Sequence, residues 1–341
     1  MDRFYYLDWL RVFATVCVVI IHVAAGYVGN MNSNYETHWL IGNLFETLSR
    51  WSVPGFVMVS GALLLRDSRE LGYWEFLKKR ASKVIIPFLG WSILFYLFGA
   101  YMGYFPSTIK HAIKLFISNE ISYHFWFLYM IIGIYLITPL FQVFVRHAKK
   151  QHIEYFLVLW LYVSFATRLM EFWFGIHLSL ELFFVKDYVG YFLLGYYLSQ
   201  FEIARKWRIA SYIGMLVGFV GTFACTYYFT ISADGQFNDF WYSYFSPTVL
   251  LSVIGLFIWF RYNVKERTLP LLAQWINQAS LGIYIIHYWL LNNLLWRVFP
   301  KVESYFHPIL SISINIGITF ILSLTIILLI KRIPIVKKLV P

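Results

Sequence analysis

The chain has 341 residues, of which 60% are hydrophobic and only 13% are charged. This balance excludes a soluble globular domain, because a water-facing surface needs more polar residues than the chain supplies. The net charge of +11 does not indicate nucleic-acid binding, because the basic residues gather at the ends of apolar segments. The sequence therefore predicts an all-α, polytopic membrane protein that forms a single domain over 1–341.

Ten apolar runs are long enough to cross the roughly 30 Å hydrocarbon core of a bilayer as helices. The first run has no small-residue cleavage site, so we expect it to be retained rather than removed as a signal peptide. The run at 184–201 is the weakest, because Asp187 and two glycines interrupt it. In chain order the runs are 6–29, 40–64, 82–104, 122–145, 154–174, 184–201, 209–230, 241–261, 275–297 and 308–331.

Basic residues alternate between the loops that join these runs. Clusters of Arg and Lys follow the second, fourth, sixth, eighth and tenth runs, whereas 30–39 and 231–240 contain neither residue. Loops rich in Arg and Lys stay in the cytoplasm. The pattern therefore predicts about ten transmembrane helices with both termini cytoplasmic.

The two cysteines, Cys17 and Cys225, both lie inside apolar runs. Their positions argue against a disulfide framework and against a thiolate metal site. We expect no metal centre in this chain.

Arg11 and His22 lie on the first run. Eleven residues at about 100° each come within about 20° of three turns, so both side chains leave one helix face about 16 Å apart. Asp8 can pair with Arg11 three residues later. Ionisable groups inside a membrane are costly and usually functional. Snorkelling of Arg11 to the cytoplasmic headgroups is an alternative, but it does not explain a histidine deeper on the same face.

Polar residues on two other runs are expected at a depth close to that of His22. Glu46 and Arg50 are four residues apart and can form an ion pair. Arg50 and His287 lie about 22 Å and about 18 Å along their helices from the cytoplasmic side, and His22 lies about 24 Å along its own. The similar depths indicate one water-accessible cavity open to the outside. A structural ion pair and a structural role for His287 stay open as alternatives.

Several further motifs follow Arg-x10-His at 11–22 in a fixed order. They are SVPGFVMVSGALL at 52–64, Arg-x-x-Arg at 66–69, RASKVIIPF at 80–88, HFWFLY at 124–129, YLITPL at 135–140 and SLGIYIIH at 280–287. With these motifs in this order, the chain resembles the acyltransferase-3 family of integral membrane acyltransferases. The resemblance implies an enzyme of the bacterial cytoplasmic membrane that acylates a cell-surface glycan. Segments 49–54 and 241–247 are similar to the type that O-acetylates enterobacterial common antigen.

The resemblance also implies acyl-CoA, most often acetyl-CoA, as a cytoplasmic co-substrate. Its phosphates suit cationic donors. Candidates are Arg11, Arg66, Arg69 and Arg80, with Lys79 and Lys83 as weaker ones. We expect His22 to act as the general base that takes the acceptor's proton while its oxygen attacks the thioester. An acyl-imidazole intermediate on His22 is the alternative.

The acceptor is expected to arrive from outside as a hydroxyl of a glycan or lipid-linked glycan. Residues expected to bind it are Glu46, Arg50, His287, Trp126 and Tyr129. Trp126 and Tyr129 also fit an ordinary interfacial aromatic belt. The lipid bilayer is a further partner, and polysaccharide-assembly proteins or a second copy of the chain stay open.

Two other function classes fit ten spans with intramembrane charges. One is a transporter that exports a glycan or lipid, although the inverted repeats and broken helix pairs typical of transporters are not visible in the sequence. The other is a structural or sensing partner of a polysaccharide machine. Neither class needs the Arg11–His22 alignment, and neither predicts consumption of a thioester.

Overall fold

The computed structural model describes residues 4–29, 31, 36–66, 72–180, 182–264 and 268–340, and within these ranges all regular structure is helical. Seven α-helices have more than 15 residues. They are α1 (Tyr5–Ala24), α4 (Tyr73–Tyr101), α6 (Trp126–His147), α10 (Arg205–Ser232), α11 (Pro247–Asn263), α12 (Leu271–Asn293) and α14 (Pro308–Arg332).

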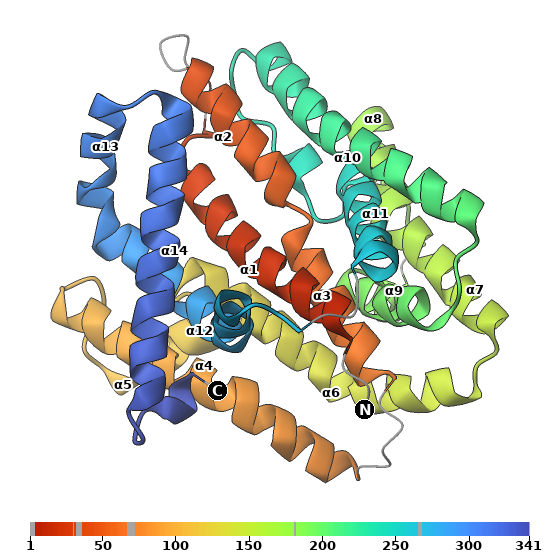
Figure 1. Ribbon diagram of the computed structural model, residues 1–341, viewed down its shortest axis with the longest axis horizontal. Helices are drawn as coiled ribbons and strands as arrows, with labels where there is room; N and C mark the ends of the chain where they lie inside the picture. Colours follow the sequence, from red (N-terminus) through yellow and green to blue (C-terminus); the bar gives the residue numbers. More distant parts are fainter. Residues whose placement is uncertain are drawn as a thin grey trace.

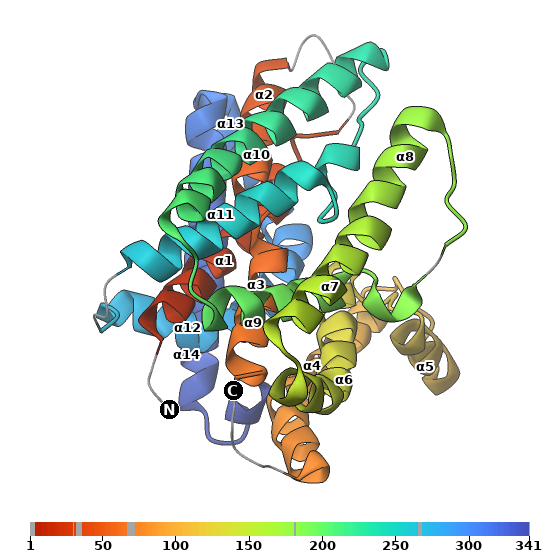
Figure 2. The same ribbon diagram turned by 90° about the vertical axis from the view of Figure 1, so that its right-hand side faces the viewer.

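Shorter helices connect and complete this bundle. The shorter α-helices are α2 (Glu36–Ser49), α3 (Ser52–Leu64), α5 (Ile109–Ile117), α7 (Lys150–Leu161), α8 (Thr167–Phe174), α9 (Tyr188–Gln200) and α13 (Phe299–Tyr305). A π-helical stretch, η3 (Tyr162–Ala166), joins α7 to α8, and Figure 2 shows the three as one rod. The 3-10 helices are η2 (Tyr123–Phe125), η4 (Phe183–Val185), η5 (Phe240–Tyr242), η6 (Leu295–Arg297) and η7 (Lys337–Leu339).

Seven helical segments of the described chain are long and apolar enough to cross a membrane. They coincide with the predicted spans 6–29, 82–104, 122–145, 154–174, 209–230, 241–261 and 308–331, which confirms an all-α polytopic membrane protein. The predicted spans 184–201 and 275–297 are also helical, as the 13-residue α9 and the more polar 23-residue α12. Both ends of the chain lie on one side of the bundle (Figures 1 and 2), as an even number of crossings requires. The count of ten and the cytoplasmic side stay predictions.

The expectation of one continuous helix over 40–64 is wrong. Helix α2 ends at Ser49 and α3 begins at Ser52, so the chain breaks at Arg50 and Trp51. Pro54 explains the break, because it has no N–H to donate to the carbonyl of residue 50 and its ring collides with that carbonyl. The break leaves Arg50 at a helix end, where its side chain can turn toward a cavity.

Helix α1 occupies the centre of the bundle, with α2, α3, α12 and α14 packed around it (Figure 1). Half of its residues are buried, among them Leu7, Leu10, Val18 and Val19. A helix surrounded by protein can carry polar groups that lipid would not tolerate. Its central position therefore supplies partners for the side chains on its Arg11–His22 face.

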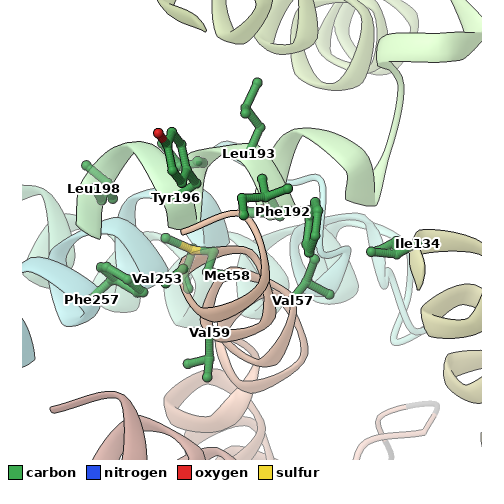
Figure 3. Close-up of a cluster of buried hydrophobic side chains, with 14 of the residues drawn as sticks. Val57, Met58, Val59, Ile134, Phe192, Leu193, Tyr196, Leu198, Val253 and Phe257 are labelled. Atoms are coloured by element: carbon green, nitrogen blue, oxygen red, sulfur yellow. The ribbon is translucent and has the colours of Figure 1, made fainter. Parts of the chain in front are cut away.

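Two glycines bring α3 and α9 unusually close. A Cβ at Gly61 would lie 1.7 Å from the carbonyl oxygen of Phe192, and a Cβ at Gly195 would lie 2.0 Å from that of Met58. Small residues at such crossings allow backbones to touch and increase dispersion contacts, which hold membrane helices together. Figure 3 shows the apolar cluster built on this crossing, with Val57 and Met58 of α3 facing Phe192 and Tyr196 of α9. The crossing gives the α1 side of the bundle a rigid support.

Candidate active site

Three histidines from different elements meet beside α1. His22 lies in the last turn of α1, His287 in α12 and His124 in η2. Nε2 of His287 is 3.1 Å from Nδ1 of His22. The ring centroid of His124 lies 5.5 Å from that of His287 and 6.3 Å from that of His22. The depth estimate from the sequence could not place these residues laterally, and the structure brings them together as one histidine cluster.

Backbone carbonyls determine which nitrogens of His22 and His287 carry a proton. Nδ1 of His22 is 2.8 Å from the carbonyl oxygen of Val18, and Nδ1 of His287 is 3.0 Å from that of Ile283. A carbonyl only accepts, so both Nδ1 atoms are donors. In the neutral rings, Nε2 of His287 then accepts from His22, and Nε2 of His22 has a lone pair. That lone pair receives no hydrogen bond from the described residues, so it is available as a base.

His124 and two tyrosines surround this pair. Nε2 of His124 donates to the carbonyl of Ile285 at 2.9 Å, which buries and orients its ring. The hydroxyl of Tyr284 donates to the backbone carbonyl of His124. The ring centroid of Tyr288 lies 5.4 Å from that of His22 and 4.9 Å from that of His124. The rings of these residues form an aromatic wall beside the cluster.

Arg11 lies at the other end of the same helix interface. Its Nη1 is 3.1 Å from Oδ1 of Asn277 on α12, and Nδ2 of Asn277 donates to Oδ1 of Asp8 at 2.9 Å. Asp8 and Arg11 lie 3.8 Å apart, as the sequence predicted. Asn277 thus bridges the ion pair. Arg11 is paired within the bundle instead of only snorkelling to the headgroups.

A cavity of about 300 Å³, the inner cavity, extends from Arg11 and Lys83 to Tyr284. Tyr284 also reaches the histidine cluster, since its ring centroid is 5.9 Å from that of His287. The inner cavity is lined by Arg11, Phe56, Ser60, Lys83, Val84, Phe127, Ile131, Tyr135, Asn277, Gln278, Ser280, Leu281 and Tyr284. It therefore extends from two cationic side chains to a tyrosine that lies beside the cluster.

A larger cavity of about 900 Å³, the outer cavity, lies beyond the cluster. Its wall includes Tyr123, whose ring is 6.2 Å from Tyr288, next to His22. Aromatic side chains line it together with charged groups of both signs. The charged lining residues are Arg50, Arg168, Glu171, Lys186 and Asp239, and the aromatic ones are Tyr123, Phe172, Tyr188, Phe237, Phe240, Tyr242, Tyr244 and Phe245.

Glu46 and Arg50 form the predicted ion pair at the break between α2 and α3. Nη2 of Arg50 is 2.6 Å from Oε2 of Glu46, although the groups are not aligned as a hydrogen bond. Glu46 is fully buried, whereas Arg50 is 18% exposed and lines the outer cavity. The guanidinium lies 4.5 Å over the ring of Tyr242, whose hydroxyl donates to Asn43 at 2.6 Å. The pair presents a cation to the outer cavity and keeps its carboxylate inside.

Trp126 and Tyr129, which the sequence placed together, lie in different surroundings. Trp126 packs against Tyr188 and Tyr244, both in the wall of the outer cavity. Tyr129 packs against Phe88, and its hydroxyl donates to the carbonyl of Phe116. Tyr129 lines neither cavity. Its contacts are those of a packing residue, while Trp126 supports the outer wall.

The arginines that the sequence places on the cytoplasmic side also differ in their surroundings. Arg66 lies 4.3 Å over the ring of Phe4 and does not line the inner cavity. Arg80 lies 6.0 Å from the ring of Tyr135, which does line it. Arg69 is outside the described residues. Of the predicted donor-side cations, Arg11 and Lys83 are therefore the ones that reach the cavity wall.

The sequence did not single out Asn277, and it indicated His124 only as the first residue of the HFWFLY motif at 124–129. Asn277 has no pattern of its own, because a lone amide on an apolar helix resembles many packing residues. One signal was present on α12: Ser280 and His287 are seven residues apart, about two turns, and so share a helix face. That face is the one that contacts α1.

Comparison with known proteins agrees with this arrangement. A family described as an acyltransferase domain, acyltransferase-3, matches residues 4–330. The chain is 32% identical over 117 residues to the succinoglycan biosynthesis protein ExoH of Rhizobium meliloti (strain 1021), covering 30% of this chain and 31% of ExoH. It is 24% identical over 254 residues to YfiQ of Bacillus subtilis (strain 168), covering 71% of this chain and 68% of YfiQ, which is named provisionally as a membrane-bound acyltransferase.

The chain thus aligns with about a third of ExoH and about two thirds of YfiQ. No solved structure matches the chain significantly. The family match spans nearly the whole bundle, including α1, α12 and the walls of both cavities. The chain belongs to the acyltransferase-3 family of membrane acyltransferases.

Proposed function

We propose that this protein moves an acyl group, most often acetyl, from cytoplasmic acyl-CoA to a hydroxyl of an extracytoplasmic or lipid-linked glycan. The observation that carries the proposal is the free Nε2 lone pair of His22. His22 lines neither cavity itself, but its cluster is joined to the inner cavity through Tyr284 and to the outer cavity through Tyr288 and Tyr123. The family match and the succinoglycan relative support an acyl transfer to a glycan.

His22 acts as the general base. As the acceptor oxygen attacks the thioester carbonyl, its proton moves to Nε2 of His22. The carbonyl of Val18 and Nε2 of His287 both face Nδ1 of His22, so they stabilise the imidazolium that forms. When the new C–O bond is complete, the C–S bond breaks and the imidazolium returns its proton to the CoA sulfur.

The donor occupies the inner cavity. Arg11 and Lys83 are cations in its wall, and the distance of about 16 Å along α1 from Arg11 to His22 is close to the reach of a pantetheine arm. The neutral arm suits the apolar lining of Phe56, Phe127 and Ile131. Asn277 keeps Asp8 turned toward Arg11, which leaves the guanidinium directed along the interface.

The acceptor occupies the outer cavity. Its volume of about 900 Å³ lies near the upper end of the range found for ligand pockets. Tyr123, Tyr188 and Tyr244 offer faces on which sugar rings can stack, while Arg50 and Arg168 offer donors for hydroxyl or carboxylate oxygens. Trp126 orients Tyr188 and Tyr244 by packing behind them.

The test is acetyl transfer by purified protein in nanodiscs, with acetyl-CoA labelled on the acetyl group. Free CoA and label on added glycolipid would be measured for wild type, His22→Gln and His147→Gln. His147 is exposed at the end of α6 and serves as the matched control. We expect loss of CoA release by about 10²–10⁴-fold in His22→Gln alone. Thermal unfolding would verify that both variants fold.

Full activity of folded His22→Gln would refute the role of His22 as base. A folded wild-type protein that neither binds CoA nor releases it from acetyl-CoA would refute the acyl-CoA reaction, and a glycan transporter would then be the better account. Label retained on the wild-type protein but absent from His22→Gln would identify an acyl-enzyme on His22 and make this residue the nucleophile in place of the base.

A further inference from the structure

A groove rich in lysine lies where the end of α14 returns to α4. It has a volume of about 560 Å³ and is lined by Ser82, Lys83, Ile86, Lys331, Lys337, Lys338 and Val340. Four of these seven residues are lysines and none is acidic. Ammonium groups held close together repel one another, so a ligand with several negative charges would stabilise Lys83, Lys337 and Lys338. We call this cavity the lysine groove.

The segment that supplies Lys337 and Lys338 is packed firmly against α4. The side chain of Leu339 fills the space over Gly90, where a Cβ would lie 2.3 Å from Cδ2 of Leu339. The indole N–H of Trp91 donates to the carbonyl of Leu339 at 3.0 Å. Val340 is 2% exposed. These packing contacts fix the segment that carries Lys337 and Lys338 beside α4 and Lys83. Basic residues that only set the orientation of a membrane protein do not need such contacts.

The lysine groove and the inner cavity share a wall. Lys83 lines both of them. Lys331 lines the groove and donates to the carbonyl of Gln278 at 2.6 Å, and Gln278 lines the inner cavity. A ligand with a polyanionic head and a long neutral arm fits this pair of spaces, with its head in the groove and its arm beside Arg11.

We infer that the lysine groove binds the phosphates at the nucleotide end of the acyl-CoA donor. This inference rests on the proposed function. CoA carries a diphosphate and a 3′-phosphate, and ammonium groups bind such oxygens through charge-assisted hydrogen bonds. A phospholipid headgroup offers the same chemistry, but a phospholipid has no arm that needs the inner cavity. The shared wall at Lys83 therefore favours the nucleotide.

The experiment measures binding of CoA, 3′-dephospho-CoA and pantetheine by calorimetry in neutral phosphatidylcholine nanodiscs. Wild type is compared with Lys337→Gln/Lys338→Gln and with Lys149→Gln/Lys206→Gln, which removes the same charge at the starts of α7 and α10. We expect the groove variant to bind CoA roughly 10- to 100-fold more weakly, since hydrogen bonds to charged groups are lost. It should also lose the preference for CoA over 3′-dephospho-CoA and bind pantetheine unchanged.

Equal CoA affinity in wild type and the groove variant would overturn the inference while leaving the proposed function intact. A second measurement repeats the comparison in nanodiscs that contain phosphatidylglycerol. Binding of phosphatidylglycerol that the groove variant loses, together with unchanged CoA affinity in that variant, would assign the groove to lipid and would also overturn the inference. Failure of folded wild type to bind CoA would instead remove the proposed function itself. Lys338→Gln alone, a smaller change, keeps the test valid if the double variant unfolds.

Discussion

The hydroxyl of Thr15 on α1 lies 2.8 Å from the hydroxyl of Ser280 on α12. This contact falls between the Arg11–Asn277 and His22–His287 contacts of the same two helices. The three contacts form a polar ladder along one interface, although 265 or 266 residues separate the partners. The ladder fixes the register of α1 against α12, and with it the alignment of Arg11 with His22.

Thr15→Val and Ser280→Ala should show coupled effects on stability. Each change removes one side of a buried contact, and Thr15 also donates to the carbonyl of Arg11 at 2.8 Å. Contacts of this kind in membranes contribute about 0.6 kcal/mol on average and up to about 1.7 kcal/mol. A double-mutant cycle followed by thermal or denaturant unfolding should give a coupling energy in this range. Strict additivity would mean that the ladder does not set the helix register.

His287→Leu should lower kcat while leaving KM for acyl-CoA unchanged. The variant removes the acceptor that faces Nδ1 of His22, so the imidazolium loses a hydrogen bond of about 1.5–3 kcal/mol, or roughly 10- to 100-fold in rate. His287→Gln should recover part of kcat, because its amide oxygen can accept. Equal losses in both variants, or a raised KM, would point to a packing role for His287.

The Glu46–Arg50 pair should respond differently to removal of either partner. Arg50→Gln leaves a fully buried carboxylate without its cation, and breaking a buried pair in this way costs about 3–5 kcal/mol. Glu46→Gln should cost less, since Arg50 reaches the outer cavity. The double variant should recover most of the stability but not acceptor turnover. These quantities would be measured as unfolding free energies and as transfer of label to glycolipid at saturating acetyl-CoA.

Gly61→Ala should destabilise the bundle, because its new methyl group would meet the Phe192 carbonyl of α9. Backbone atoms yield little, so we expect a loss of about 3 kcal/mol or more. Gly133→Ala in α6 is the matched control, since nothing lies within 4 Å of its Cβ position. That variant should be neutral or gain up to about 1 kcal/mol from helix propensity. Similar melting temperatures for the two variants would contradict the close crossing of α3 and α9.

Much of the helical layout could be predicted from the sequence, because length and apolarity decide which segments cross a membrane. The shared face of Arg11 and His22 followed from helix periodicity alone. Lateral partners could not be predicted, since Asn277, Ser280 and His287 meet α1 only through long-range packing. Pro54 could have predicted the helix break at Arg50, but the prediction of span 40–64 used hydropathy alone, and hydropathy does not indicate a helix break. Lys337 and Lys338 could be interpreted from the sequence only as residues that set membrane orientation, because the packing of their segment against α4 is a long-range contact.

The inner and outer cavities share no lining residue among those described, and aromatic contacts join each of them to the histidine cluster, through Tyr284 on one side and through Tyr123 and Tyr288 on the other. A bacterial cytoplasmic membrane carries a voltage, and each elementary charge that crosses 100 mV releases about 2.3 kcal/mol. A continuous water path through the bundle would dissipate that energy as a leak of protons and ions. In the proposed reaction this aromatic layer serves as electrical insulation, through which the acyl group passes while the ionic gradients are kept.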